Sequence, residues 1–205
     1  MTSVLVFGGT FDPVHNGHLA IARQARTGTG AEAVWFVPAA LAPLRDTPHA
    51  TPQERFELLE AACADSGEPG LAVLDTAIRR GGISYTADVM DALRTEHPDR
   101  DLAVLIGADA ARTVNSWHRA GDLLRMERFV IVNRTGSPPL DPGEMTRLGY
   151  AAARTTLLTV DSPDVSASDI RCRSARRLSL QGLVPDVVAS LIERTGMYRQ
   201  NGDDA

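Results

Sequence analysis

The chain has 205 residues, of which 43% are hydrophobic, and it carries a formal net charge of −5. This length and apolar content suit one domain, residues 1–205, with a buried core. The acidic balance argues against broad nucleic-acid binding, and no apolar run is long enough to span a membrane. The chain enters a strand-like run at once, with no basic or cleavable leader, which favours the cytoplasm.

Strand-like and helix-like segments alternate along the chain. In chain order, the expected strands are 4–7, 33–37, 71–74, 102–106, 129–132 and 157–160. The expected helices are 19–25, 52–64, 86–97, 108–114, 120–126, 167–180 and 185–194. Thr51 and Pro52 suit the cap and first position of the second helix, and the proline-rich segment 136–143 suits a surface loop. The alternation predicts an α/β fold with a Rossmann-like parallel sheet, helices on both faces and a small C-terminal helical part at about 165–198.

The segment from 8 to 18, Gly-Gly-Thr-Phe-Asp-Pro-Val-His-Asn-Gly-His, joins the first strand to the first helix. A glycine pair at a strand end lets the backbone approach a ligand closely. The helix that follows directs free N–H groups and a positive dipole end toward that ligand, and His15 and His18 lie on one side of its entry. The segment lacks the Gly-Lys-Ser/Thr of a Walker A loop and the GxGxxG spacing. It therefore predicts a polyphosphate site, and the alternative is a turn that carries two surface histidines.

A second segment, Val-Ser-Ala-Ser-Asp-Ile-Arg at 165–171, opens the first C-terminal helix. Ser166 or Ser168 suits the helix cap. Arg171 follows in the first turns, and its planar guanidinium can bind phosphate oxygens through two hydrogen bonds. The alternative is a capped surface helix with Arg171 in solvent.

In this order, the two segments resemble the HxGH and ISxxxIR signatures of the nucleotidyltransferase superfamily. In that superfamily both signatures hold the phosphates of a nucleoside triphosphate. The resemblance implies backbone contacts to ATP from the first signature and phosphate binding by the histidines, the hydroxyls and the arginine. The implied residues are Gly8, Gly9, Thr10, Phe11, His15, His18, Ser166, Ser168 and Arg171.

Three further segments, at 81–88, 106–110 and 115–118, extend the resemblance over nearly the whole chain, from Val4 to Tyr198. With them the chain is similar to the bacterial nicotinate mononucleotide adenylyltransferases. The resemblance implies that Trp117 stacks on the pyridine ring and that backbone groups of Thr86 and His118 receive the nicotinate carboxylate. It also implies that Asp109 contacts ribose. A cationic ring over an indole face gains about 0.5–2 kcal/mol. The alternatives are a core role for Trp117 and a helix-cap role for Asp109.

The loop after the second strand departs from this family. Many members carry Pro-Pro-His-Lys or Pro-Pro-His-Arg there, whereas residues 42–45 are Ala-Pro-Leu-Arg. Arg45 keeps the positive end, and Leu44 stands in place of the histidine. His49 is either a substitute or, as we favour, a surface residue. Arg134 is a candidate phosphate contact or an exposed arginine.

The resemblance implies adenylyl transfer from ATP to nicotinate mononucleotide, giving deamido-NAD and pyrophosphate. His15 and His18 lack a third ligand at convincing spacing, so we expect no protein metal site and Mg²⁺ that arrives on the ATP phosphates. Cys63 and Cys172 are expected to be reduced. The alternatives are another acceptor, nicotinamide mononucleotide or phosphopantetheine, and a non-catalytic paralogue that binds nucleotide. The sequence leaves the oligomeric state open, including a homo-oligomer.

Overall fold

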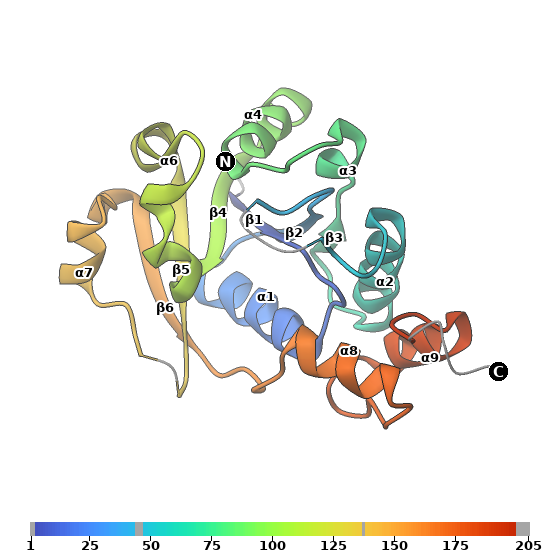
Figure 1. Ribbon diagram of the computed structural model, residues 1–205. Helices are drawn as coiled ribbons and strands as arrows, with labels where there is room; N and C mark the ends of the chain where they lie inside the picture. The colour runs from blue at the N-terminus through green and yellow to red at the C-terminus, as the bar shows by residue number, and fades with distance from the viewer. Residues whose placement is uncertain (1–2, 44–46, 137, 200–205) are drawn as a thin grey trace.

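A six-stranded parallel sheet forms the centre of the computed structural model, which describes residues 3–43, 47–136 and 138–199 (Figure 1). Its strands are β1 (Ser3–Gly9), β2 (Ala33–Pro38), β3 (Leu71–Val73), β4 (Asp101–Gly107), β5 (Arg128–Arg134) and β6 (Thr155–Val160). Their order in the sheet is β3-β2-β1-β4-β5-β6. Strands are added on one side of β1 up to β3 and on its other side from β4 onward, so the strand order reverses between β1 and β4. Ligands of such sheets bind outside the carboxyl ends of the strands at this reversal. The Rossmann-like fold class predicted from the sequence is confirmed.

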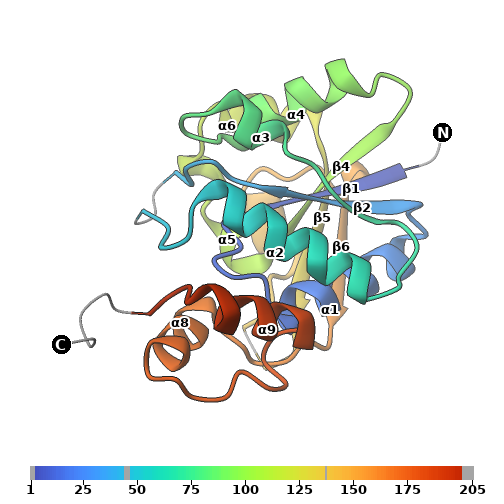
Figure 2. The same ribbon diagram turned by 90° about the vertical axis from the view of Figure 1, so that its right-hand side faces the viewer.

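Helices cover both faces of the sheet (Figures 1 and 2). One face carries α1 (Asn16–Thr29), α2 (Pro52–Asp65), α8 (Ala167–Ala175) and α9 (Asp186–Thr195). The other carries α3 (Thr76–Arg80), α4 (Thr86–Glu96), α5 (Ala108–Arg112), α6 (Ala120–Met126) and α7 (Pro142–Arg147). Short 3₁₀ turns η1 (Val114–Ser116) and η2 (Ala152–Arg154) complete the fold. The C-terminal helices α8 and α9 thus lie beside α1 and α2.

Alternation along β1 supplies both halves of the core. Leu5 and Phe7 enter the cluster beneath α1 and α2, whereas Val4 and Val6 enter the cluster beneath α4 and α5. Successive strand residues point to opposite faces, and a parallel sheet covered on both sides buries both sets. The continuous apolar run at 102–106 is buried for the same reason.

Two of the predicted boundaries that were wrong have a local cause in the structure. The helix expected at 167–180 ends at Ala175, because Arg177 takes a left-handed conformation (φ 54°) and the backbone N–H of Leu178 turns back to the carbonyl of Arg173. Such a left-handed residue ends a helix. The loop expected at 136–143 gives way at Pro142 to α7, whose cap Asp141 accepts a hydrogen bond from the N–H of Glu144.

The starts of α1, α2 and α3 agree only in part with the sequence predictions. Thr51 caps α2 with Pro52 in its first turn, as predicted. The helix expected from residue 19 already begins at Asn16, and α3 was not predicted at all. Both cysteines are free thiols. Among the described residues, no helix is long and apolar enough to cross a membrane.

Candidate active site

The loop after β1 is shaped by the packing of Phe11. Its ring is buried edge-on against Phe7 and Phe36, and its backbone has φ 52°. A Cβ on Gly9 would lie 2.8 Å from the Phe11 ring, so only glycine fits there. A Cβ on Gly8 would meet no atom within 4 Å. The side chain of Phe11 thus belongs to the core, and the open side of the loop lies at Gly8.

His15 and His18 stack at the entry of α1. Their ring centroids are 3.7 Å apart, and the backbone N–H of His15 donates to His18 Nδ1 at 3.3 Å. Gly17 permits this arrangement, because a Cβ there would lie 3.1 Å from the His15 ring. The alternative of two surface histidines is wrong for His15, which is 7% exposed.

Both histidines are neutral at pH 7. Burial, assisted by the charge of Arg134, lowers the pKa of His15 to about 4. Burial lowers the pKa of His18 well below its ordinary value, and His15 and Arg134 add to this effect. Each ring therefore offers one N–H donor rather than a full positive charge. Nδ1 of His15 is buried and has no hydrogen-bond partner among the described residues, and such a group calls for an explanation that a bound ligand would supply.

The second motif contacts the first through Arg171 and Asp12. Ser166 caps α8 by accepting from the N–H of Asp169 at 3.1 Å, whereas Ser168 is exposed in the first turn. Arg171 donates through Nη1 to the backbone oxygen of Asp12 at 2.8 Å. The alternative that leaves Arg171 in solvent is therefore wrong.

Asp12 organises the loop through its side chain. The carboxylate is 5% exposed and accepts from the N–H groups of His49 and Ala50, at 2.8 and 3.1 Å. The imidazole of His49 is 61% exposed, with Nδ1 3.6 Å from Asp12 Oδ2. His49 is thus a surface residue, as favoured, whose backbone secures the loop.

Sequence reasoning missed Arg55. The side chain is fully buried and makes four hydrogen bonds to backbone oxygens, those of Thr10, Ala39, Ala40 and Ala50. It therefore fastens the loop after β2 to the loop after β1. One signal was available: Arg55 shares the buried face of α2 with Leu58, Leu59 and Ala62 at helical spacing.

Asp109 lies just after the carboxyl end of β4, Arg134 is the last residue of β5, and the two side chains contact one another. Arg134 Nη2 lies 3.3 Å from Asp109 Oδ2, and the Asp109 side chain is 72% exposed. The cap position of α5 is Gly107, so the helix-cap alternative for Asp109 is wrong. The charge of Arg134 also lowers the pKa of His15 and of His18.

The segments assigned to the acceptor adjoin each other. Thr86 begins α4, and the ring of Tyr85 beside it lies 4.4 Å from the ring of His118. Trp117 packs partly against the core and donates from Nε1 to Thr113 Oγ1 at 3.1 Å, which leaves both predicted roles open. Arg45 and Leu44 lie outside the described residues.

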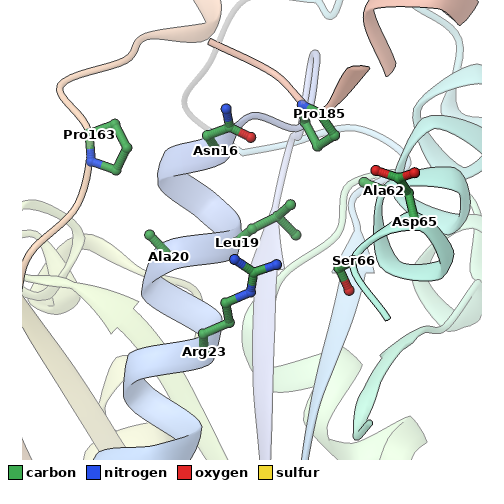
Figure 3. A pocket seen from close by; sticks show the side chains of 9 residues that line it. All are labelled: Asn16, Leu19, Ala20, Arg23, Ala62, Asp65, Ser66, Pro163 and Pro185. Carbon is green, nitrogen blue, oxygen red and sulfur yellow. The ribbon is translucent and has the colours of Figure 1, made fainter. Parts of the chain in front are cut away.

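A cavity of about 400 Å³ lies between α1, the end of α2 and the segments at Pro163 and Pro185 (Figure 3). Side chains of α1, including Leu19 and Arg23, line one wall, and the end of α2 with Asp65 and Ser66 lines another. Arg23 pairs with Glu68 at 3.3 Å. None of the predicted site residues that the structure describes lines this cavity, so the fold rather than the cavity locates the site.

Comparisons with known proteins agree with the fold and the family resemblance. The cytidylyltransferase-like family matches residues 6–173. A probable nicotinate-nucleotide adenylyltransferase of Herpetosiphon aurantiacus is 34% identical over 198 residues, which is 97% of this chain and 99% of that protein. One of Exiguobacterium sibiricum is 37% identical over 193 residues, or 94% of this chain and 97% of that protein.

Solved structures support the fold independently. The nicotinic acid mononucleotide adenylyltransferase of Plasmodium falciparum, complexed with NaAD, superposes with a TM-score of 0.79 at 14% identity and covers 97% of this chain and 98% of its own. At that identity the likeness shows the fold alone, whereas the sequence relatives show the family. The chain belongs to the nicotinate-nucleotide adenylyltransferases of the cytidylyltransferase-like family.

Proposed function

We propose that this protein transfers AMP from ATP to nicotinate mononucleotide, forming deamido-NAD and pyrophosphate. An oxygen of the acceptor 5′-phosphate attacks the α-phosphorus of ATP and forms a new P–O bond. The bond from the α-phosphorus to the bridging oxygen breaks, and pyrophosphate leaves with that electron pair. The acceptor phosphate is already ionised at neutral pH, so no protein nucleophile is needed, and catalysis consists of positioning and charge stabilisation.

One observation carries the proposal: two motifs far apart in the sequence converge at the switch point of the sheet. The stacked pair His15 and His18 opens α1 there, and Arg171 reaches the same loop through its 2.8 Å bond to Asp12. Backbone donors, two neutral imidazole donors and one guanidinium suit a polyphosphate. The orphaned Nδ1 of His15 supports a ligand at this position.

We assign the ATP phosphates to the loop Gly8, Gly9, Thr10 and Phe11, to the two histidines, and to α8 with Ser166, Ser168 and Arg171. Among the described residues no group of three histidines, cysteines or carboxylates could hold a metal ion. We propose that Mg²⁺ enters as part of the substrate MgATP, where it neutralises phosphate charge.

We assign the acceptor to the neighbouring segments. Trp117 stacks on the pyridine ring, and the backbone at Thr86 and His118 receives the carboxylate at the N-terminus of α4. Asp109 accepts from ribose hydroxyls. Arg134 and Arg45 are assigned to phosphate. The charge of Arg134 lowers the pKa of both histidines, which supports its place near the phosphates.

Pyrophosphate release with ATP and each of three acceptors tests the function. We expect release with nicotinate mononucleotide and at least tenfold lower kcat/KM with nicotinamide mononucleotide, because its amide would leave buried donors unpaired at about 1–3 kcal/mol each. Equal efficiencies would contradict the carboxylate assignment. Release with phosphopantetheine alone would assign a different enzyme, and release with none would favour a nucleotide-binding paralogue.

A further inference from the structure

The chain returns to the signature loop at its C-terminal end. After α9, Gly196 adopts a left-handed conformation, and the Met197 carbonyl accepts from Ser174 Oγ of α8 at 3.0 Å. Tyr198 follows, itself at φ 65°, and its hydroxyl donates to Asp12 Oδ1 at 2.9 Å. The segment after α9 is thus tied both to α8 and to the loop after β1.

Asp12 connects this tyrosine to Arg171. Its carboxylate accepts from Tyr198, while its backbone oxygen accepts from Arg171 Nη1 at 2.8 Å. The same guanidinium nitrogen lies 3.9 Å from Asp12 Oδ2. One buried residue thus contacts both Tyr198 and the arginine of α8.

We propose that Tyr198 is a positioning residue for nucleotide binding, holding Asp12 so that Asp12 holds Arg171 toward the ATP phosphates. The proposal rests on the proposed function, which places those phosphates at Arg171. A flexible arginine loses rotamer freedom when it binds, and a guanidinium that is already oriented loses less. Burial, with the Asp12 charge beside it, raises the pKa of Tyr198, so the hydroxyl stays protonated and able to donate.

Tyr198→Phe removes the hydroxyl and keeps the ring. If the hydroxyl orients Arg171, the variant raises KM for ATP about tenfold, the scale of one lost hydrogen bond to a charged group, and changes KM for nicotinate mononucleotide less than twofold. Tyr150→Phe is the matched control, because its buried hydroxyl also makes one hydrogen bond, to the Ala111 carbonyl at 3.0 Å. We expect the control to leave both KM values within twofold.

A double-mutant cycle separates positioning from general stabilisation. In an Arg171→Ala background, Tyr198→Phe should weaken ATP use less than twofold further, because its effect passes through Arg171. An unchanged KM for ATP in the single variant, or the full tenfold loss in both backgrounds, would overturn the proposal.

Calorimetric titration with MgATP keeps this test apart from the assignment of the reaction. Weaker ATP binding by Tyr198→Phe than by Tyr150→Phe would support the positioning role even if no acceptor gave pyrophosphate, an outcome that would reject only the proposed function. Equal ATP affinity in the two variants would reject the positioning role whatever the acceptor.

Discussion

Arg55→Met should destabilise the protein more than any exposed arginine substitution. Methionine keeps much of the aliphatic length but removes every donor, so the carbonyls of Thr10, Ala39, Ala40 and Ala50 lose their partner. At about 1 kcal/mol net for each hydrogen bond, the loss is about 4 kcal/mol. For a chain of this length, that corresponds to a fall in Tm of about 8–16 °C.

Thermal unfolding followed by circular dichroism measures this effect, with Arg154→Met as the control. Arg154 is exposed and donates to a single carbonyl, that of Met126 at 2.8 Å, so its loss should cost about 0.5 kcal/mol or less. The Tm of Arg55→Lys should lie between those of Arg55→Met and Arg154→Met. A single ammonium group cannot replace the several donors of the guanidinium, which point in different directions. If Arg55→Met melted within about 2 °C of the control, the fastening role assigned to Arg55 would be wrong.

Substitutions at three positions probe the site. Arg171→Ala should lower kcat/KM for ATP about 10- to 150-fold, which corresponds to the loss of a hydrogen bond to a charged group. Arg171→Lys should keep only part of the parent activity. Full activity of the lysine variant would show that a positive charge alone is enough. Between pH 7 and pH 5, the free energy of unfolding should fall by about 2 kcal/mol more for the parent protein than for His15→Asn. The reason is that histidine in the unfolded chain binds a proton near pH 6.5, whereas folded His15 stays unprotonated down to about pH 4. Denaturant melts in which both proteins lose the same stability over this pH range would contradict the burial of a neutral His15. Trp117→Ala should raise KM for nicotinate and nicotinamide mononucleotides alike, since the stacked ring is common to both. If steady-state kinetics showed a changed ratio of kcat/KM between the two acceptors, Trp117 would lie at the carboxylate instead.

The sequence was sufficient wherever a pattern had a local physical cause. The apolar run at 102–106 had to be a buried strand, and the glycine pair with two histidines had to join a strand to a helix. The pairing of Thr51 with Pro52 likewise located the start of α2. The ends of elements were harder, because Arg177 adopts a left-handed conformation that only its surroundings stabilise.

The supports of the site escaped prediction because they join segments far apart in the chain. Arg55 appears in the sequence as an ordinary helix arginine, and its four carbonyl partners are scattered over two loops. Tyr198 lies 186 residues from Asp12, its partner. The motifs could be placed from spacing, whereas the groups that hold them together required the fold.

A crystal structure with a non-hydrolysable ATP analogue and nicotinate mononucleotide would show directly where the two substrates bind. We expect the triphosphate to lie against residues 8–11, within hydrogen-bond distance of His15, His18 and Arg171. The acceptor phosphate oxygen should lie about 3–3.5 Å from the α-phosphorus, in line with the leaving pyrophosphate. A triphosphate bound elsewhere, for example in the cavity beside Arg23, or an acceptor on the far side of the sheet would show that the assigned site is wrong.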